Sequence, residues 1–428
     1  MSLTNDFVRR TRFFDQMFRE FHEVSFAVHA ADGWSWRSDP AREPQCALLF
    51  RSAAAWNALM DNPTQRTLGE AYIHGDLDVE GDLFAVFPVV RYVLHTAASS
   101  HYHALRAVWR ASTDFARLLR HGPRHSESRD RAAIAYHYDQ PIEFYRPWLG
   151  PTLVYSCAYF RDPSESLESA QANKLELICR KLELQQNDRF LDIGCGWGSL
   201  VLHAASRYRA HASGITLSQG QAAVARQRIT HARLDALCQV ALRDYRELPR
   251  SDARFDKIAS VGMFEHVGRK RLRHYFKLAL QILKPNGLFL NHGIARSAAV
   301  PPAQDSFIDR YVFPDGELAT LGEVVEIAEA AGFEVRDVEN LRSHYERTLR
   351  LWVENLESCA IALRQHIPEK TYRIWRLYMA GSAEAFRRGD IELYQVLLGS
   401  RPARKSVVVH REHWYQNWST ESSSAAVW

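Results

Sequence analysis

The chain has 428 residues, of which 46% are hydrophobic and 24% are charged, and such values are ordinary for globular proteins. This composition excludes a disordered chain, a collagen-like repeat and a small disulfide scaffold, and the length predicts two or three domains with a large core. The 54 Lys and Arg residues against 50 Asp and Glu residues leave a formal charge of only +4, so charge gives no argument for a nucleic-acid partner.

Neither the opening residues nor the cysteines indicate export. Residues 1–16 hold no apolar stretch ahead of a cleavage site, and no segment reaches the ~20 apolar residues that cross a bilayer. The six cysteines are scattered and form no CxxC pair, so we predict no metal site and a reducing compartment. The expectation is a soluble cytoplasmic protein.

Residues 1–125 predict a mixed, helix-rich domain. Apolar side chains recur at helical spacing near its start, and they predict either a core face or a contact for an apolar ligand: Phe13, Phe14, Met17, Phe18 and Phe21. Residues 69–87 place Gly and Asp turn signals around a short alternating segment.

Residues 101–131 form a basic stretch in which several arginines share one predicted helix face. Such a face is either solvated or in contact with anionic lipid headgroups. The polar end of the stretch contains Gly and Pro, and we predict a linker at 126–134.

Between residues 186 and 300, short apolar runs alternate with helical stretches. We predict strands at 189–195, 211–218, 236–242, 255–263 and 288–294. Helices are predicted at 197–208, 219–232 and 271–283, the last ending at a KPNG turn. Strands and helices that alternate in this way form βαβ units with a parallel sheet, whose ligands lie at the carboxyl ends of the strands.

The first chemical motif is the DIGCGWG run at 192–198, between a predicted strand and a helix. Its glycines permit a tight turn and let a ligand lie against bare backbone. The run lacks the GxGxxG spacing of dinucleotide folds, and it closely resembles the S-adenosylmethionine (SAM) loop of class I methyltransferases. That resemblance implies cofactor contacts from Asp192, Gly194, Cys195 and Gly196.

Three further strand ends complete the predicted pocket. The second strand ends without the carboxylate that often binds the ribose, so Thr216 and Gln221 are the predicted replacements, with Ser218 as a helix N-cap. Leu217, between them, is also a predicted cofactor contact. Asp244, Tyr245 and Arg246 follow the third strand, where adenine binds in the class I layout. The fourth strand is followed by SVGMFEHVG at 260–268, which differs from the Asn-Pro-Pro-Tyr type motif of nucleic-acid methyltransferases and favours an apolar substrate.

The complete set of motifs resembles the cyclopropane-fatty-acyl-phospholipid synthase family, in that family's order, over roughly 135–400. The motifs are YSCAYF, LESAQ.NKL, DIGCGWG, GITLS..Q, DYR.L, SVGMFEHVG and AFRRGDIELYQ. The resemblance implies an α/β fold with a Rossmann-like class I methyltransferase domain at 135–400. A smaller helix-rich lipid- or membrane-binding domain at 1–125 would precede it. The basic, Trp-containing tail at 401–428 is either an interfacial anchor, a packed segment or a loose one.

The resemblance also implies the chemistry. The methyl group of SAM would pass to a cis double bond of a phospholipid acyl chain, and a bound bicarbonate would take the proton whose loss closes the ring. Tyr155 and Ser156 would contact the cofactor, and aromatic faces such as those of Tyr159, Phe160, Phe264, Tyr311 and Tyr378 could stabilise passing positive charge. The implied bicarbonate holders are Glu265, His292 and Tyr378, with the backbones of Cys157 and Ile294. The implied protein is a homodimer, peripheral at the inner membrane face.

Two alternatives remain at this stage. Loss of a proton from a chain carbon would give a methylene-branched chain, which a reductase could convert to a methyl branch. A lipid-binding protein with an inactive methyltransferase domain is the alternative of another class, and the intact glycine loop with Glu265 and His292 argues against it.

Overall fold

The computed structural model describes residues 3–60, 63–98, 140–250, 252–301, 307–313, 316–401 and 411–416. The chain divides into two compact units, each built from separate segments. Unit 1 holds residues 1–122, 303–312 and 368–384, and unit 2 holds the remainder. The basic stretch 101–131 and the linker predicted at 126–134 lie outside the described residues.

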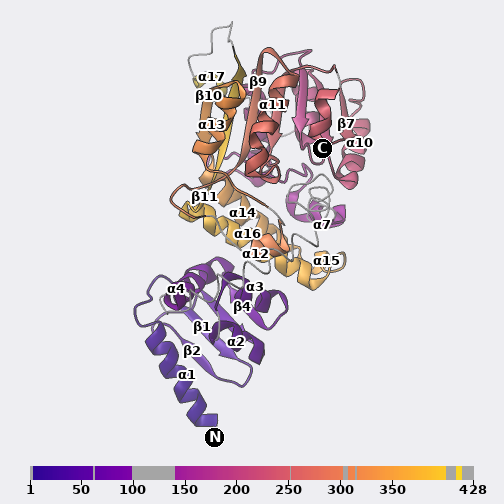
Figure 1. The fold of residues 1–428 in the computed structure, drawn as a ribbon. Helices are drawn as coiled ribbons and strands as arrows, with labels where there is room; N and C mark the ends of the chain where they lie inside the picture. Colours follow the sequence, from indigo (N-terminus) through magenta and orange to yellow (C-terminus); the bar gives the residue numbers. More distant parts are fainter. Residues whose placement is uncertain are drawn as a thin grey trace, which may run out of the picture. The chain divides into compact units, whose positions relative to one another are not determined.

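Unit 1 contains a four-stranded sheet in the order β2-β1-β3-β4 (Figure 1). The strands are β1 (Phe26–Ala30), β2 (Ser35–Arg37), β3 (Cys46–Phe50) and β4 (Leu77–Gly81), and the helices include α1 (Leu3–Met17), α2 (Ala53–Met60), α3 (Gln65–Ile73) and α4 (Val86–Ala98). Phe14, Phe18 and Phe21 are buried against rings from β1 and β2, whereas Phe13 is exposed. The aromatic stripe predicted from the sequence is therefore largely a core face.

Two later segments of the chain complete unit 1. The contiguous domains expected from the sequence, at 1–125 and 135–400, stay a prediction. They contain α12 (Phe307–Tyr311) and most of α16 (Glu369–Arg388). The Tyr311 hydroxyl donates to Glu70 of α3 at 2.9 Å. Residues near 70 thus contact residues beyond 300 within one compact unit.

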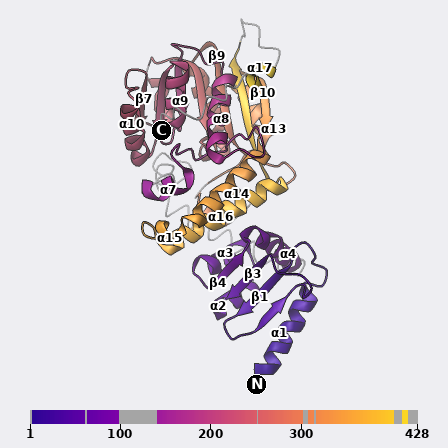
Figure 2. The ribbon, with the colours of Figure 1, turned by 180° about the vertical axis from the view of Figure 1, so that it is seen from behind.

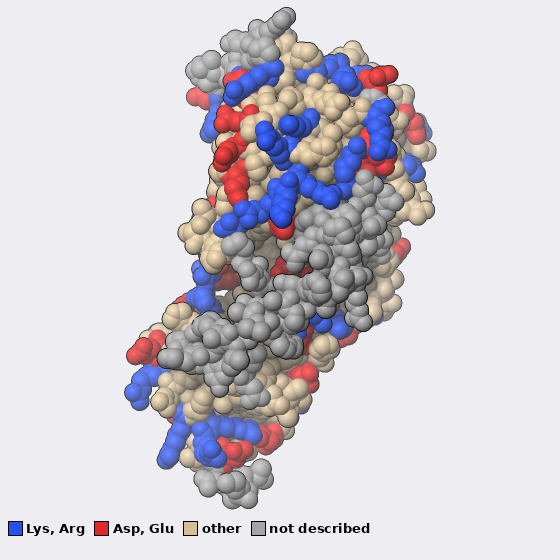
Figure 3. Space-filling model, in the orientation of Figure 1, with Lys and Arg blue, Asp and Glu red and all other residues tan. Residues whose placement is uncertain are grey.

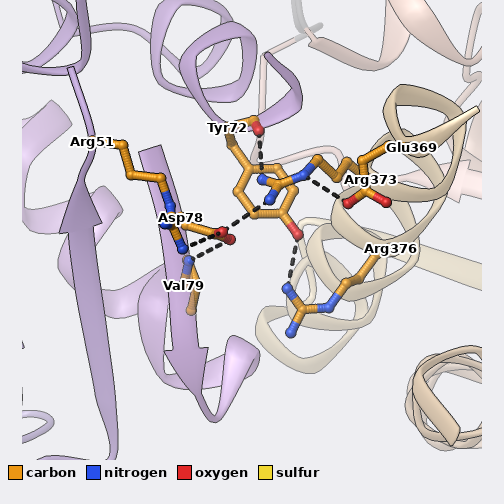
Figure 4. A network of polar contacts seen from close by, with 7 residues as sticks. All are labelled: Arg51, Tyr72, Asp78, Val79, Glu369, Arg373 and Arg376. Carbon is orange, nitrogen blue, oxygen red and sulfur yellow. Dashed lines mark hydrogen bonds and ion pairs between the residues drawn. The ribbon is translucent and has the colours of Figure 1, made fainter. Parts of the chain in front are cut away.

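A polar network joins α16 to β4 and α3 (Figure 4). The Arg373 guanidinium donates to the Asp78 carboxylate and to the Tyr72 carbonyl oxygen, both at 2.9 Å, and its centre lies 5.0 Å from the centroid of the Tyr72 ring. Arg376 donates to the Tyr72 hydroxyl at 2.7 Å, and Arg51 approaches Asp78 at 3.2 Å. The network ties a late helix to the N-terminal sheet through charge-assisted hydrogen bonds.

Unit 2 is a seven-stranded sheet with helices on both faces (Figures 1 and 2). In order across the sheet the strands are β10 (Phe333–Asn340), β11 (Ile391–Ser400), β9 (Leu283–Arg296), β8 (Phe255–Val261), β5 (Arg189–Ile193), β6 (His211–Thr216) and β7 (Cys238–Leu242). Neighbours among β5 to β9 pair in parallel, and β11 is antiparallel to both β9 and β10. The order reverses between β5 and β8, which is where open α/β sheets bind ligands.

The helices α8 (Leu167–Lys181), α9 (Ser199–Tyr208) and α10 (Gln219–His231) cover one face of this sheet, seen in Figure 2. The helices α11 (Leu272–Ile282) and α13 (Leu321–Ala331) cover the other, seen in Figure 1. A separate apolar core lies under each layer. β5 is buried on both faces beyond Arg189, which agrees with its apolar residues Phe190, Leu191 and Ile193.

The predicted strands and helices between 186 and 300 are confirmed, with one correction. The KPNG segment does not separate α11 from the next strand, because β9 already begins at Leu283. Its pairing with β8 jumps from Phe255↔Leu283 to Lys257↔Leu288, and Asn286 has φ 60°. The turn residues therefore form an irregularity inside the strand.

The described part of the tail, residues 411–416, packs on unit 2. Trp414 is buried, the Tyr415 hydroxyl donates to Glu339 of β10 at 3.0 Å, and Arg180 of α8 donates to the Gln416 carbonyl oxygen at 2.6 Å. This segment is thus the packed alternative rather than an exposed anchor. Within the described residues, no helix is long and apolar enough to span a membrane.

We predict that Arg373→Met destabilises unit 1 by about 1–3 kcal/mol, because Asp78 and the Tyr72 carbonyl lose their buried donor. Hydrogen exchange should then speed up in α3 and β4. Arg401→Met is the matched control, since its ion pair with Glu329 is about half exposed on both sides, and it should cost less than about 0.5 kcal/mol. Equal protection in wild type and Arg373→Met would contradict the prediction.

Candidate active site

A pocket opens at the carboxyl ends of β5, β6 and β8, on the side of the predicted motifs. Eleven of the twelve predicted cofactor-binding residues line it: Tyr155, Ser156, Asp192, Gly194, Cys195, Gly196, Thr216, Leu217, Gln221, Tyr245 and Arg246. Lining residues that the sequence did not single out include Lys174, Trp197, Arg243, Met263 and His266. The structure therefore gathers segments from across unit 2 at the reversal of the strand order.

The glycine loop takes its shape from positive φ angles and close packing. Gly194 and Gly198 have φ 84° and 82°, in the left-handed region that favours glycine. A Cβ at Gly194 would lie 2.9 Å from the Met263 side chain. The N–H groups of Gly194 and Cys195 both donate to the Ile215 carbonyl oxygen at 2.9 Å, which holds the loop against β6.

The end of β6 carries a polar pair in place of a carboxylate. The Thr216 hydroxyl donates to the Gln221 side-chain oxygen at 2.8 Å, and both side chains are buried in the pocket wall. Ser218 accepts from the Gln221 N–H at 3.2 Å and is the N-cap of α10, as expected. Hydroxyl and amide groups here are suited to the hydroxyls of a sugar.

Asp244 differs from the other predicted cofactor contacts, because it does not line the pocket. Its buried carboxylate accepts from Arg246 Nε at 2.9 Å and from an Arg246 terminal nitrogen at 2.6 Å. In this structure Asp244 orients Arg246, which does line the pocket. A direct cofactor contact by Asp244 stays a prediction.

The YSCAYF loop is held by polar side chains of α8. Gln171 donates to the Ser156 carbonyl oxygen and Lys174 Nζ donates to the Ser156 hydroxyl, each at 2.8 Å. Asn173 donates to the Tyr159 carbonyl oxygen at 3.3 Å. The LESAQ.NKL motif therefore has a physical role that spacing alone did not reveal, since it fixes the backbone that presents Tyr155 and Ser156 to the pocket.

A second polar cluster lies where β9 passes the end of β8. The parallel pairing ends at Val261↔His292, and the next N–H on that edge, from Ile294, donates to Glu265 Oε1 at 2.8 Å. Glu265 follows β8 on a short 3-10 turn (Phe264–His266). The Ile294 N–H predicted to hold a ligand is thus occupied by the Glu265 carboxylate.

His292 is buried beside this cluster and is oriented from β11. Gln395 Nε2 lies 3.2 Å from His292 Nδ1. An amide nitrogen only donates, so with this placement Nδ1 accepts and Nε2 carries the proton. Among the described atoms, neither His292 Nε2 nor Glu265 Oε2 has a hydrogen-bond partner. Two buried polar atoms are therefore left for a ligand.

Burial shifts the titration of both groups. It raises the pKa of Glu265 from 4.5 to about 7, despite the hydrogen bond from Ile294. Burial, reinforced by the positive charges of Lys174 and Lys181, holds the pKa of His292 well below its ordinary value. Near neutral pH the cluster thus combines a neutral imidazole with a carboxyl group close to its midpoint.

The remaining predicted site residues are placed differently. Cys157 is buried, its thiol donates to the Ala158 carbonyl oxygen at 3.1 Å, and burial raises its pKa, which suits no nucleophilic role. Tyr378, like Tyr311, belongs to unit 1, so its membership of the site stays a prediction. Phe160 packs under the Arg347 guanidinium, and Tyr159 stacks on His344.

We predict that Gly293→Ala disrupts this cluster, because a Cβ there would overlap the Phe264 ring and lie 3.2 Å from Glu265 Oε1. The cost should be about 1–3 kcal/mol in thermal unfolding. Gly322→Ala is the control, since its Cβ would meet no atom within 4 Å on α13 and should be neutral or slightly stabilising. An unchanged melting temperature for Gly293→Ala would contradict the prediction.

Two parts of the chain match two different protein families. Residues 125–396 match the mycolic acid cyclopropane synthetase family, and residues 13–101 match a domain family of unknown function (DUF7884). A probable fatty acid methyltransferase of Pseudomonas putida is 40% identical over 84% of this chain and 88% of its own. The cyclopropane-fatty-acyl-phospholipid synthase of Escherichia coli is 38% identical over 63% of this chain and 69% of its own.

The fold agrees with the sequence match. The crystal structure of the mycolic acid cyclopropane synthase CmaA1 with SAH and CTAB superposes with a TM-score of 0.59 at 32% identity, over 63% of this chain and 98% of that one. Its bound SAH is the form that SAM takes after it has given up its methyl group. The chain therefore belongs to the mycolic acid cyclopropane synthetase family of SAM-dependent, lipid-modifying methyltransferases.

Proposed function

We propose that the protein is a cyclopropane-fatty-acyl-phospholipid synthase that transfers the methyl group of SAM to a cis double bond of a phospholipid acyl chain. The observation that carries the proposal is the pair of buried, unpartnered atoms Glu265 Oε2 and His292 Nε2. Buried polar atoms normally have partners, so these two favour a small polar ligand at the site.

The pocket residues fit SAM. The glycine loop leaves no side chain at Gly194 or Gly196, which favours close approach of a ligand to the backbone. Thr216 and Gln221 suit the ribose hydroxyls, and Tyr245 with Arg246 suits the adenine. The buried Asp192 carboxylate has an unpartnered Oδ1, which suits the ammonium group of the methionine part. SAM, when bound, supplies an electrophilic methyl group.

Glu265 and His292 would hold a bicarbonate ion, which when bound supplies the base that removes a proton. Neutral His292 would donate from Nε2, and Glu265 Oε2 would accept the hydroxyl proton of the ion. The Ile294 N–H then orients the carboxylate. The backbone of Cys157 and the Tyr378 hydroxyl complete the set that we propose from the family resemblance.

We also propose a phospholipid partner at the membrane surface and a homodimer, both on the family resemblance. A feature of unit 2 supports membrane contact. Arg269, Lys270, Arg273 and Lys277 are exposed on or just before α11. The face of unit 2 that includes α11 carries many Lys and Arg side chains (Figure 3). Such side chains favour anionic headgroups. One of them, Arg269, also forms an ion pair with Glu323.

A second candidate is supported by the Pseudomonas relative, whose name specifies a probable fatty acid methyltransferase and no ring product. Loss of a proton from a chain carbon would give a methylene branch with the same mass as a cyclopropane. Which proton leaves depends on where the base lies relative to the new methyl group, and this distinguishes the two candidates chemically.

Lipid analysis in a host that has cis-unsaturated phospholipids and no cyclopropane synthase tests the proposal. We expect acyl chains heavier by one CH₂, with the retention time of a cyclopropane and resistance to hydrogenation. Glu265→Gln should lower this product at least about 100-fold, whereas Glu326→Gln, at an exposed position of α13, should leave it unchanged. A hydrogenation-sensitive product would replace the proposal with the methylene alternative, and no product from folded protein would reject both.

The raised pKa of Glu265 predicts a stability effect that does not depend on turnover. Its pKa of about 7 in the folded chain exceeds the ordinary 4.5, so the folded state holds the proton more tightly and loses stability as pH rises from 4.5 to 7. Glu265→Gln keeps an acceptor for Ile294 without the charge. Its unfolding free energy relative to wild type should therefore rise with pH, by roughly 3 kcal/mol at most. A pH-independent difference in denaturant titrations would refute this assignment.

A further inference from the structure

Lys174 is a buried cation that the chemistry proposed above does not use. It lies on α8, 2% exposed, and lines the cofactor pocket together with Ser156 and Asp192. Its Nζ donates to the Ser156 hydroxyl at 2.8 Å. Among the described residues, no carboxylate lies within ion-pair distance of Nζ. A buried ammonium group is costly unless an anion accompanies it.

The arginines that line the same pocket are in a different position, because each has a carboxylate of its own. Arg246 pairs with Asp244 at 2.6 Å, and Arg243 lies 3.8 Å from Glu247. Burial, partly offset by Cys157 and Asp192, lowers the pKa of Lys174 to about 8, so the side chain still carries its charge at neutral pH. Unlike these arginines, Lys174 has no carboxylate partner among the described residues of the pocket wall.

We propose that Lys174 and the Ser156 hydroxyl bind the carboxylate of the methionine part of SAM. Ser156 accepts a hydrogen bond from Lys174, so its own O–H is left to donate to an anion. Asp192 supplies the opposite charge in the same wall, with Oδ1 unpartnered for the ammonium group. A buried acid and a buried base in one pocket match a zwitterion, and the carboxylate completes the pairing of Lys174.

The α8 scaffold supports this assignment. Gln171, one turn before Lys174, donates to the Ser156 carbonyl oxygen at 2.8 Å, so both polar groups of Ser156 are held from the same helix. Lys174 thus holds the hydroxyl and Gln171 holds the backbone of the same residue before a ligand binds, and a preorganised donor loses less entropy on binding. The inference rests on SAM being the cofactor, and not on the identity of the lipid product.

Calorimetric titration of the full chain with S-adenosylhomocysteine and with 5′-methylthioadenosine tests the proposal. The second ligand lacks both the carboxylate and the ammonium group, so its affinity also reports whether the pocket is folded. Lys174→Met should weaken S-adenosylhomocysteine binding about 10- to 100-fold and leave 5′-methylthioadenosine binding within about twofold. Lys174→Arg should restore part of the loss. Lys181→Met is the matched control, because Lys181 lies on α8, is fully buried and pairs with Asp337 and Glu339. It should lower stability without selective loss of S-adenosylhomocysteine.

The pH dependence gives a second readout. Cys157 and Asp192 also act on Lys174, and burial raises the pKa of Asp192 to about 7. Above pH 7, where Asp192 is ionised, the ratio of the two affinities in wild type should fall as Lys174 loses its proton, and Lys174→Met should lack this fall. Equal weakening of both ligands would mean that Lys174 only stabilises the fold, and unchanged S-adenosylhomocysteine binding would mean that it faces no carboxylate. Either result overturns the proposal. Because the readout is binding, it decides the role of Lys174 even where no lipid product forms.

Discussion

The end of the parallel pairing between β8 and β9 is the constraint on which the candidate site depends. Beyond His292 the strand β9 continues alone beside β11, and the N–H of Ile294 faces an edge that β8 no longer occupies. A buried N–H must find an acceptor, and the Glu265 carboxylate provides it. That single hydrogen bond fixes a carboxyl group at the end of the sheet and leaves its second oxygen for other chemistry.

This arrangement buries several ionisable groups, which lowers the stability of the fold. Asp192 and Glu265 have pKa values raised by burial to about 7, and burial lowers the pKa of Lys174 to about 8. Each group would be more stable in water, so a fold selected for stability alone would replace them. Perturbed groups collected at one edge of a sheet are typical of sites that bind charged ligands.

Contacts on both faces of the unit 2 sheet hold these groups in place. On one face, α8 holds the YSCAYF loop through Gln171, Asn173 and Lys174. On the other, the Phe264 ring fits against the bare backbone of Gly293, so the turn that carries Glu265 cannot shift freely. In unit 1, Arg373 has a comparable role, because its hydrogen bonds connect α16 to β4 and α3.

Local patterns determined much of this protein. Strand and helix positions between 186 and 300, the glycine loop and the Ser218 cap follow from periodicity, glycine placement and capping chemistry, which act over a few residues. The pocket residues at the strand ends were predicted from the resemblance of their motifs to those of class I methyltransferases. Tertiary structure alone decided the long-range contacts: Gln395 orients His292 from 103 residues away, and Tyr378 belongs to unit 1. These contacts depend on strand order and on helix packing, which no local pattern encodes.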